Sequence, residues 1–518
     1  MRENNNKKVR SVASILLRFG LGLFILIALL IVTPHISMAF DLGYHWDLNR
    51  DALVELGVRR DSDALKVINV MNMNCDLFEQ AKAVISGALD AWYFFIPLPI
   101  AGFCHLMYPQ DCRDLSDTYL HFDALSNYTE VEAQWDRLLK NTYRAVILAR
   151  GDNDVLGFLT ILGISLHQVQ DFYSHSNWVN LELQGDGDAT WFDVHPDVKR
   201  TLAIRTTGVS GSVYDHTGYH KDFAGRPGFE GAYHLAYYAT LQWAEKVRSW
   251  VGSDFWNRAM NYNCPTLLQI DIELFFTKYL SWYVGHYKGV DEKSSDDFLA
   301  VILAYINYGF TNPVTARIRW YYINKWMSWC RFLTSMPDSG TYPADLSQMS
   351  YPLKRYWLRI NITSVRQTDN DPIWDIDPGG KADFYGKVFV NGVEYLLPMH
   401  EDKDSVELTN WIVLVPFSSI PARLDLSIQV WDEDCVGGGV LPSLRGADDM
   451  CDIDPALEEK PGGNRTTYLQ WVFLNMKLWL MVSAMVLLGM SLMGMGTRQK
   501  LFSMSLLTIF QGEGSHQR

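Results

Sequence analysis

The residues of this sequence best suited to chemistry are two histidines and an aspartate spaced four positions apart. His167, Asp171 and His175 lie within the segment Leu166–Trp178. Because four residues advance an α-helix by about 40° beyond a full turn, the three side chains are expected on one face. Imidazole and carboxylate groups at this spacing can bind a common metal ion. The alternative is that these groups only form hydrogen bonds inside a helical core.

Three further residues, outside this segment, strengthen the metal interpretation: His45, Asp76 and His121. Each of them alone would more often be a satisfied core or surface group than a ligand. Taken together with the first three, they form a constellation of histidine and aspartate that suits Zn²⁺.

The overall composition bears on the classes of partner. The chain has 518 residues and a formal net charge of −14, from 45 Lys and Arg against 59 Asp and Glu. Affinity for nucleic-acid phosphates comes largely from clustered Lys and Arg, so double-stranded nucleic acid is not expected as a partner. The hydrophobic content of 48% is that of a globular protein, and the length predicts more than one domain.

The N-terminal residues resemble an export signal. Basic residues precede the apolar run Phe19–Val32, and the small residues of Ser37–Ala39 follow it. This pattern predicts that residues 1–39 are a signal peptide and that Phe40 becomes the mature N-terminus. An uncleaved signal anchor is the alternative, although the run is short for a membrane span.

The C-terminal region contains a second apolar stretch. Residues 478–496 carry no charge and are followed by Arg498 and Lys500, which predicts a single transmembrane helix with residues 497–518 as a cytoplasmic tail. A buried helix is the alternative reading. Together the two ends predict a single-pass, membrane-anchored protein of the secretory pathway, extracytoplasmic from residue 40 to about 470.

An extracytoplasmic location permits disulfide bonds. Cys104 with Cys112 and Cys435 with Cys451 are plausible local pairs. The chain has seven cysteines, so at least one thiol is expected to be free.

The pattern of apolar residues predicts a multidomain α+β protein. A helical domain is expected over residues 40–345, an antiparallel β-sandwich over 346–456 and a stalk over 457–477. Helical periodicity is found in Asp51–Leu56, Val131–Ala149, Val155–Val179, Tyr233–Val251 and Leu267–Tyr287. Strand-like alternation is found in Trp357–Ile362, Gly386–Val390 and Leu424–Val430.

Three motifs of the helical part carry a resemblance to a known family: "YHWDLNRDALVELG", "LHFDAL" and "LHQVQDFYSHSNW". The region from Phe40 to about Gly252 resembles the Het-C-type branch of the zinc-dependent phospholipase C and single-strand nuclease superfamily. The resemblance implies an all-helical phosphodiesterase fold with up to three Zn²⁺ ions. Carried over by position, one zinc would take Asp76, His121, His167 and Asp171. A second would take the α-amino group and carbonyl of Phe40 together with His45, with Asp171 as the bridge.

The third zinc site of that family is where this sequence departs from the pattern. His175 follows Asp171 by four positions, where the family uses a longer step. His234 is the candidate from the next helix, but Tyr238 stands where the family has a carboxylate, and Glu230 could substitute for it. His216 and His220 are further candidates, so the third site is expected to be weak, altered or absent.

The acidic loops of the β region resemble those of a C2 domain, in which carboxylates at one end of a sandwich bind Ca²⁺. Matched to that pattern, the expected calcium ligands are Asp377, Asp383, Asp432 and Asp434, with Asp449 less well matched. The alternative is a solvated acidic loop that ends the strands.

These expectations combine into a membrane-anchored, zinc-dependent phosphodiesterase, similar to a phospholipase C, with a calcium-dependent membrane-docking domain. Asp171 and His167 are the residues expected to be central to catalysis, and Asp123 and Asp114 are candidates for a general base. Phospholipid or another phosphodiester is the expected substrate. The alternatives are a non-catalytic adhesion or recognition protein and, third, a single-strand nuclease.

Overall fold

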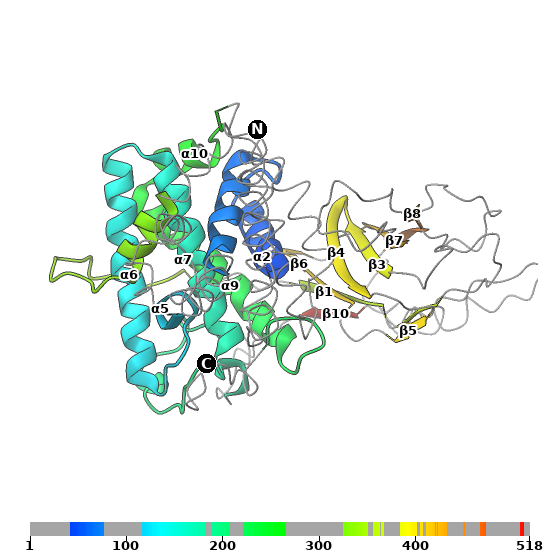
Figure 1. The fold of residues 1–518 in the computed structure, drawn as a ribbon, viewed down its shortest axis with the longest axis horizontal. Coiled ribbons are helices and arrows are strands. Elements are labelled where there is room, and N and C mark those ends of the chain that lie inside the picture. The colour runs from blue at the N-terminus through cyan, green and yellow to red at the C-terminus, as the bar shows by residue number, and fades with distance from the viewer. Residues whose placement is uncertain are drawn as a thin grey trace, which may run out of the picture.

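A computed structural model of the chain combines helices in its first part with antiparallel strands in its last part (Figure 1). This confirms the α+β class at a coarse level. The structure describes residues 42–76, 117–181, 189–207, 221–265, 325–350, 356–362, 364–366, 384–400, 405–407, 411–419, 421, 423–432, 449–450, 467–472 and 508–511. The predicted signal peptide, the apolar stretch 478–496 and the expected helix Leu267–Tyr287 lie outside these ranges.

The helical unit contains three described helices of more than twenty residues, α6, α7 and α9, and shorter elements around them. Its named elements are α2 (Leu42–Glu55), α5 (Asp117–His121), α6 (Tyr128–Gly151), α7 (Val155–His175), the 3₁₀ helix η2 (Trp178–Asn180), α8 (Pro196–Lys199), α9 (Phe229–Val251) and α10 (Ser253–Met260). Residues 63–76 and 325–334 are also helical.

Helix α7 is the centre of the unit. From Leu156 to His175 all of its residues are buried, including the polar ones. Among the described residues, α7 is the one helix long and apolar enough to cross a bilayer, and its burial is that of a core helix. It ends at His175 rather than at Val179 as expected from sequence, because Ser176 adopts an extended conformation and pairs with Thr206.

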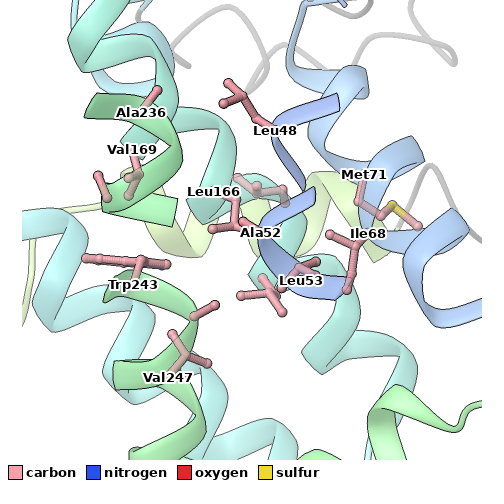
Figure 2. Close-up of a cluster of buried hydrophobic side chains, with 14 of the residues drawn as sticks. Leu48, Ala52, Leu53, Ile68, Met71, Leu166, Val169, Ala236, Trp243 and Val247 are labelled. Carbon is pink, nitrogen blue, oxygen red and sulfur yellow. The ribbon is translucent and has the colours of Figure 1, made fainter. Parts of the chain in front are cut away.

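A single hydrophobic core joins α2, α7, α9 and residues 63–76. Figure 2 shows side chains of this core from the four elements, namely Leu48, Ala52 and Leu53 of α2, Leu166 and Val169 of α7, Ala236, Trp243 and Val247 of α9, and Ile68 and Met71 of residues 63–76. Gly163 of α7 permits the closest approach, since a Cβ atom there would lie 2.5 Å from the carbonyl oxygen of Ile68. The helix of residues 63–76 therefore packs against α7 one turn before His167.

The strands that the structure describes form three antiparallel sheets. They are β1 (Tyr356–Asn361), β2 (Ser364–Arg366), β3 (Phe384–Val390), β4 (Val393–His400), β5 (Ser405–Glu407), β6 (Ile412–Phe417), β7 (Arg423–Asp432), β8 (Asp449–Met450), β9 (Thr467–Val472) and β10 (Thr508–Gln511). One sheet has the order β10-β1-β6, another β4-β3-β7-β8 with β9 also on β7, and β2 pairs with β5.

The β1–β6 sheet lies between the helices and the rest of the β unit. Alternate residues of a strand point to opposite faces. Trp357 and Leu414 belong to the helical core, whereas Leu358 and Val415, their neighbours in sequence, belong to the core of the β unit. The helices and the β unit therefore share a continuous packed interface, with α2 and α9 on the helical side (Figure 1).

Two strands lie in segments that were expected to be outside the β-sandwich. β9 falls in the predicted stalk and pairs with β7, and β10 falls in the predicted cytoplasmic tail and pairs with β1. Both strands therefore extend the β unit beyond the residues 346–456 that the sequence assigns to it.

The cysteine expectation is confirmed as far as the described residues reach. Cys75 and Cys264 are buried thiols that form no disulfide. The two expected local pairs lie outside the described residues.

Candidate metal centre

Five predicted ligands converge at one buried point of the helical unit. His45 comes from α2, Asp76 from the helix of residues 63–76, His121 from the end of α5, and His167 and Asp171 from successive turns of α7. Each is at most 2% exposed. Two overlapping groups have the mutual distances of metal ligands, one of His45, His167 and Asp171 and one of Asp76, His121 and His167.

Asp171 directs its two carboxylate oxygens to different histidines. Oδ1 lies 3.1 Å from Nε2 of His45, while Oδ2 lies 2.8 Å from Nδ1 of His121 and 2.9 Å from Nε2 of His167. The two latter nitrogens are 3.0 Å apart. Asp171 thus contacts histidines of both groups through different oxygens, while His167 is the residue that belongs to both groups.

Asp76 closes the centre from the opposite side. Its Oδ1 lies 3.8 Å from Nδ1 of His121 and 3.7 Å from Nε2 of His167, and its Oδ2 lies 3.9 Å from Nε2 of His45. These separations exceed those of hydrogen bonds and match ligand atoms arranged around a common ion.

Gln170 orients His45 and was not predicted from the sequence. Its Oε1 accepts hydrogen bonds from Nδ1 of His45 at 2.7 Å and from the Asn72 amide at 3.2 Å. Its Nε2 donates to Oδ1 of Asn49 and to Oγ1 of Thr240. All four hydrogen-bonding positions of the amide are used, so Nε2 of His45 is left to face Asp171.

Asn72 orients His167 in the same way. Its Oδ1 lies 3.4 Å from Nδ1 of His167 and can accept a hydrogen bond from it, which leaves the lone pair on Nε2 in that tautomer. A signal for these amides was present in the sequence, since Gln170 directly precedes Asp171 and Asn72 precedes Asp76 by four residues.

The electrostatics of the centre suit a cation. Burial lowers the pKa of His167 to about 3, although Asp171 opposes the shift, so its ring is neutral. Burial alone would raise the pKa of Asp171, but His167 and the hydrogen bonds from the histidines hold it well below its usual value. A neutral imidazole lone pair therefore faces an ionised carboxylate oxygen at 2.9 Å. Two electron-pair donors at this distance are stabilised by a cation bound between them.

His175 lies apart from the five. Its Nδ1 donates to Asp123 Oδ1 at 2.7 Å and to the carbonyl of His121 at 3.0 Å, and its Nε2 lies 3.8 Å from Asp222. Burial lowers its pKa, but the carboxylates more than compensate and raise it to about 10. Eight residues advance a helix by about 80° beyond two turns, which turns His175 away from the face of His167. Asp123, a candidate base, is occupied by the same pairing.

His234 and Glu230, proposed for a third zinc site, lie instead against the β unit. The His234 ring stacks on Trp357 with centroids 4.0 Å apart, and Glu230 pairs with Arg359 at 2.9 Å. The Tyr238 hydroxyl accepts a hydrogen bond from Trp357 Nε1. These contacts could not be predicted from the sequence, because Trp357 and Arg359 follow α9 by more than one hundred residues.

Several predicted site residues lie outside the described ranges: Phe40, Asp114, His216, His220, Asp377, Asp383 and Asp434. For Asp432 and Asp449 the structure describes the backbone, at the end of β7 and in β8.

Comparison with known proteins gives one match to a family model. Residues 110–190 match the family model of the VWA7 N-terminal domain. The chain matches no curated protein. The matched stretch contains four of the candidate metal ligands, namely His121, His167, Asp171 and His175.

The match corrects the expected family. The resemblance to the Het-C-type branch of the zinc phospholipase C superfamily is wrong, because the matching model is that of the VWA7 N-terminal domain. The motif "DFYSHSNW", on which the resemblance mostly rested, falls inside the matched residues. A short ligand motif reports the chemistry of a helix face and does not by itself distinguish families that use the same chemistry.

Proposed function

We propose that the chain is a zinc-dependent hydrolase of phosphodiesters with two metal ions bridged by Asp171. The division of the Asp171 carboxylate between His45 on one side and His121 with His167 on the other carries this proposal. A carboxylate can bind two cations through its two oxygens, whereas an imidazole nitrogen offers one lone pair to one cation. Asp171 is therefore the bridge, with His45 in one site and His121, His167 and Asp76 in the other.

The protein residues supply the binding and orientation that such chemistry needs. Two bound zinc ions would lower the pKa of a shared water and polarise a phosphoryl oxygen. Gln170 holds His45 in the tautomer that presents Nε2, and Asn72 does the same for His167. The ring of His167 stays neutral down to a pH of about 3, so it can remain a ligand at physiological pH.

Phospholipid is the substrate class that the rest of the chain favours. The predicted export signal and the acidic composition support a lipid phosphodiester over nucleic acid. A secretory-pathway location at a membrane surface is part of this proposal, with the anchor at 478–496 as one route to that surface.

A calcium site at one end of the β unit is a second part of the proposal. The register places Asp432 of β7 opposite Phe384 of β3 and opposite Asp449 of β8. Asp383 directly precedes Phe384 in the sequence, and Asp434 follows β7 by two residues. Like charges at opposed positions of neighbouring strands are unfavourable, and Ca²⁺ would compensate them.

A recognition or adhesion protein with structural zinc is the second candidate function. The complete burial of the five ligands supports it, because a structural metal site is closed whereas a catalytic one keeps a position open to substrate. The two candidates differ in turnover and not in metal content.

Turnover by the purified full-length chain separates these functions. We expect zinc-dependent hydrolysis of p-nitrophenyl phosphocholine or of ethanolamine or inositol phosphodiesters, stopped by a chelator and absent in Asp171→Asn. Activity on single-stranded DNA alone would indicate a nuclease. A chain that holds its zinc and hydrolyses none of these substrates would instead establish the recognition function.

A further inference from the structure

Helix α2 makes polar contacts on two of its faces. His45 and Asn49, four residues apart, face the metal centre, where His45 approaches Asp171 and Asn49 accepts a hydrogen bond from Gln170. Asp47, Arg50 and Asp51 face the β unit. The same short helix therefore touches both the candidate ligand shell and the β unit.

The second face is a buried charged contact with β4. Arg50, 6% exposed, donates from Nη1 to the carbonyl oxygen of Glu394 at 2.9 Å and to Asp47 at 2.9 Å, and from Nε to Asp51 at 2.7 Å. Its guanidinium lies 4.3 Å from the centre of the Tyr395 ring. The Tyr395 hydroxyl donates to Oδ2 of Asp51 at 3.1 Å, which closes the network.

This charged network holds α2 in a defined position against β4. An isolated buried charge is costly, so Arg50 and Asp51 must stay together and against β4 for both to be satisfied. The guanidinium makes several directed contacts at once, which sets the rotation of α2 as well as its distance from the strand.

Rotation of α2 matters most for one of the two proposed metal sites. His45 is the described ligand that α2 supplies, whereas Asp76, His121 and His167 come from other elements. A shift of α2 would move His45 away from Oδ1 of Asp171 and Asn49 away from Gln170. It would leave Oδ2 of Asp171 beside His121 and His167.

We propose that the Arg50–Asp51–Tyr395 contact is a positioning device through which the β unit sets the metal affinity of the site that contains His45. This inference rests on the proposed two-metal centre. In it, the β unit is a structural part of the centre, and a ligand or partner that displaced β4 from α2 would release one metal selectively.

The test is the zinc stoichiometry and affinity of the full-length chain, measured by competition with a chromophoric chelator. The variants are Arg50→Met, which removes the charge, and Tyr395→Phe, which removes only the hydroxyl bond to Asp51. Leu424→Ala, in the core of the β unit and paired with β9 rather than with β4, is the control for lost stability without a change at α2. Supporting interactions of metal ligands are worth roughly 10–100-fold in metal affinity.

We expect Arg50→Met to weaken one zinc by at least about tenfold and leave the other unchanged. Tyr395→Phe should shift the same zinc in the same direction by less, and Leu424→Ala should shift neither. Equal weakening of both ions in all three variants would reduce the contact to general stability and overturn the inference. If Arg50→Met and Tyr395→Phe both bind two zinc ions with unchanged affinity, the inference is overturned but the proposed two-metal centre is not. A wild-type chain without a second zinc would overturn the proposed centre and this inference with it.

Discussion

Gln170 Oε1 lies 2.7 Å from Nδ1 of His45 and makes the hydrogen bond that determines which nitrogen of His45 faces the metal centre. The amide is itself held by Asn49 and Thr240 and so cannot turn. Its neighbour Gln168, equally buried on α7, contacts none of the five ligands through a hydrogen bond described in the structure.

We predict that Gln170→Ala weakens zinc binding by roughly 10–100-fold, because His45 would lose its orienting partner. Zinc affinity by chelator competition is the measurement, and Gln168→Ala is the matched control on the same helix. Equal affinities for the two variants would show that Gln170 only fills space.

Asp171→Asn should release zinc and abolish hydrolysis together. The amide nitrogen cannot bind a cation, so one arm of the bridge is lost and the remaining oxygen carries no full charge. Metal analysis and turnover should be measured on one preparation. Asp136→Asn, an exposed aspartate paired with Lys140, is the control and should change neither.

Gly163→Ala should destabilise the helix packing next to the metal centre, although Gly163 is not itself a ligand. The added methyl group would lie 2.5 Å from the Ile68 carbonyl oxygen and 2.9 Å from Cβ of Met71, so the helix carrying Asp76 must move away from α7. Overpacking of this kind costs about 1–3 kcal/mol of unfolding free energy. Gly151→Ala, where the methyl group meets no atom within 4 Å, should be tolerated. A Gly163→Ala chain as stable as wild type would contradict the close approach of these helices.

His234 should make the interface of α9 with the β unit sensitive to acid. Burial lowers its pKa from 6.5 to about 3, and its Nε2 has no hydrogen-bond partner among the described residues. Between these values the unfolded chain binds more protons than the folded one, so stability falls as pH falls from 6.5 towards 3. The slope from this residue is at most about 1.4 kcal/mol per pH unit.

His234→Phe keeps a ring on Trp357 and removes the titration. Denaturant unfolding between pH 7 and 4 should therefore show a shallower loss of stability in His234→Phe than in wild type. His195→Phe, an exposed histidine, serves as control and should leave the slope unchanged. Parallel pH profiles for wild type and His234→Phe would count against the burial of this imidazole.

The ligands of the metal centre could be predicted from the sequence better than the contacts of the residues around them. His167 and Asp171 share a helix face because of their spacing alone, and His45, Asp76 and His121 stand in recognisable local motifs. His175 belongs to the same motif, but the accumulated rotation of α7 directs it to Asp123 and Asp222. The direction of the His175 side chain therefore depends on the helical rotation between positions 167 and 175 and on partners that lie outside the motif.

The contact that His234 makes depends on tertiary packing, which the local sequence pattern does not predict. His234, with Glu230 four residues before it, was expected as a zinc ligand, yet its ring stacks on Trp357 of β1. Likewise, the alternation of β1 predicts two faces and does not say that one of them covers helices. The strand β10 pairs with β1 from a segment whose sequence resembles a tail behind a membrane span.

The zinc content of the purified full-length chain tests the central claim most directly. Elemental analysis should find at least two zinc ions per chain in the wild type, because Asp171 offers one oxygen to each of two ligand sets. His45→Ala should then lose one zinc, and His121→Ala should lose the other. A wild-type chain with one zinc or none, after reconstitution with excess metal, would contradict a carboxylate-bridged centre.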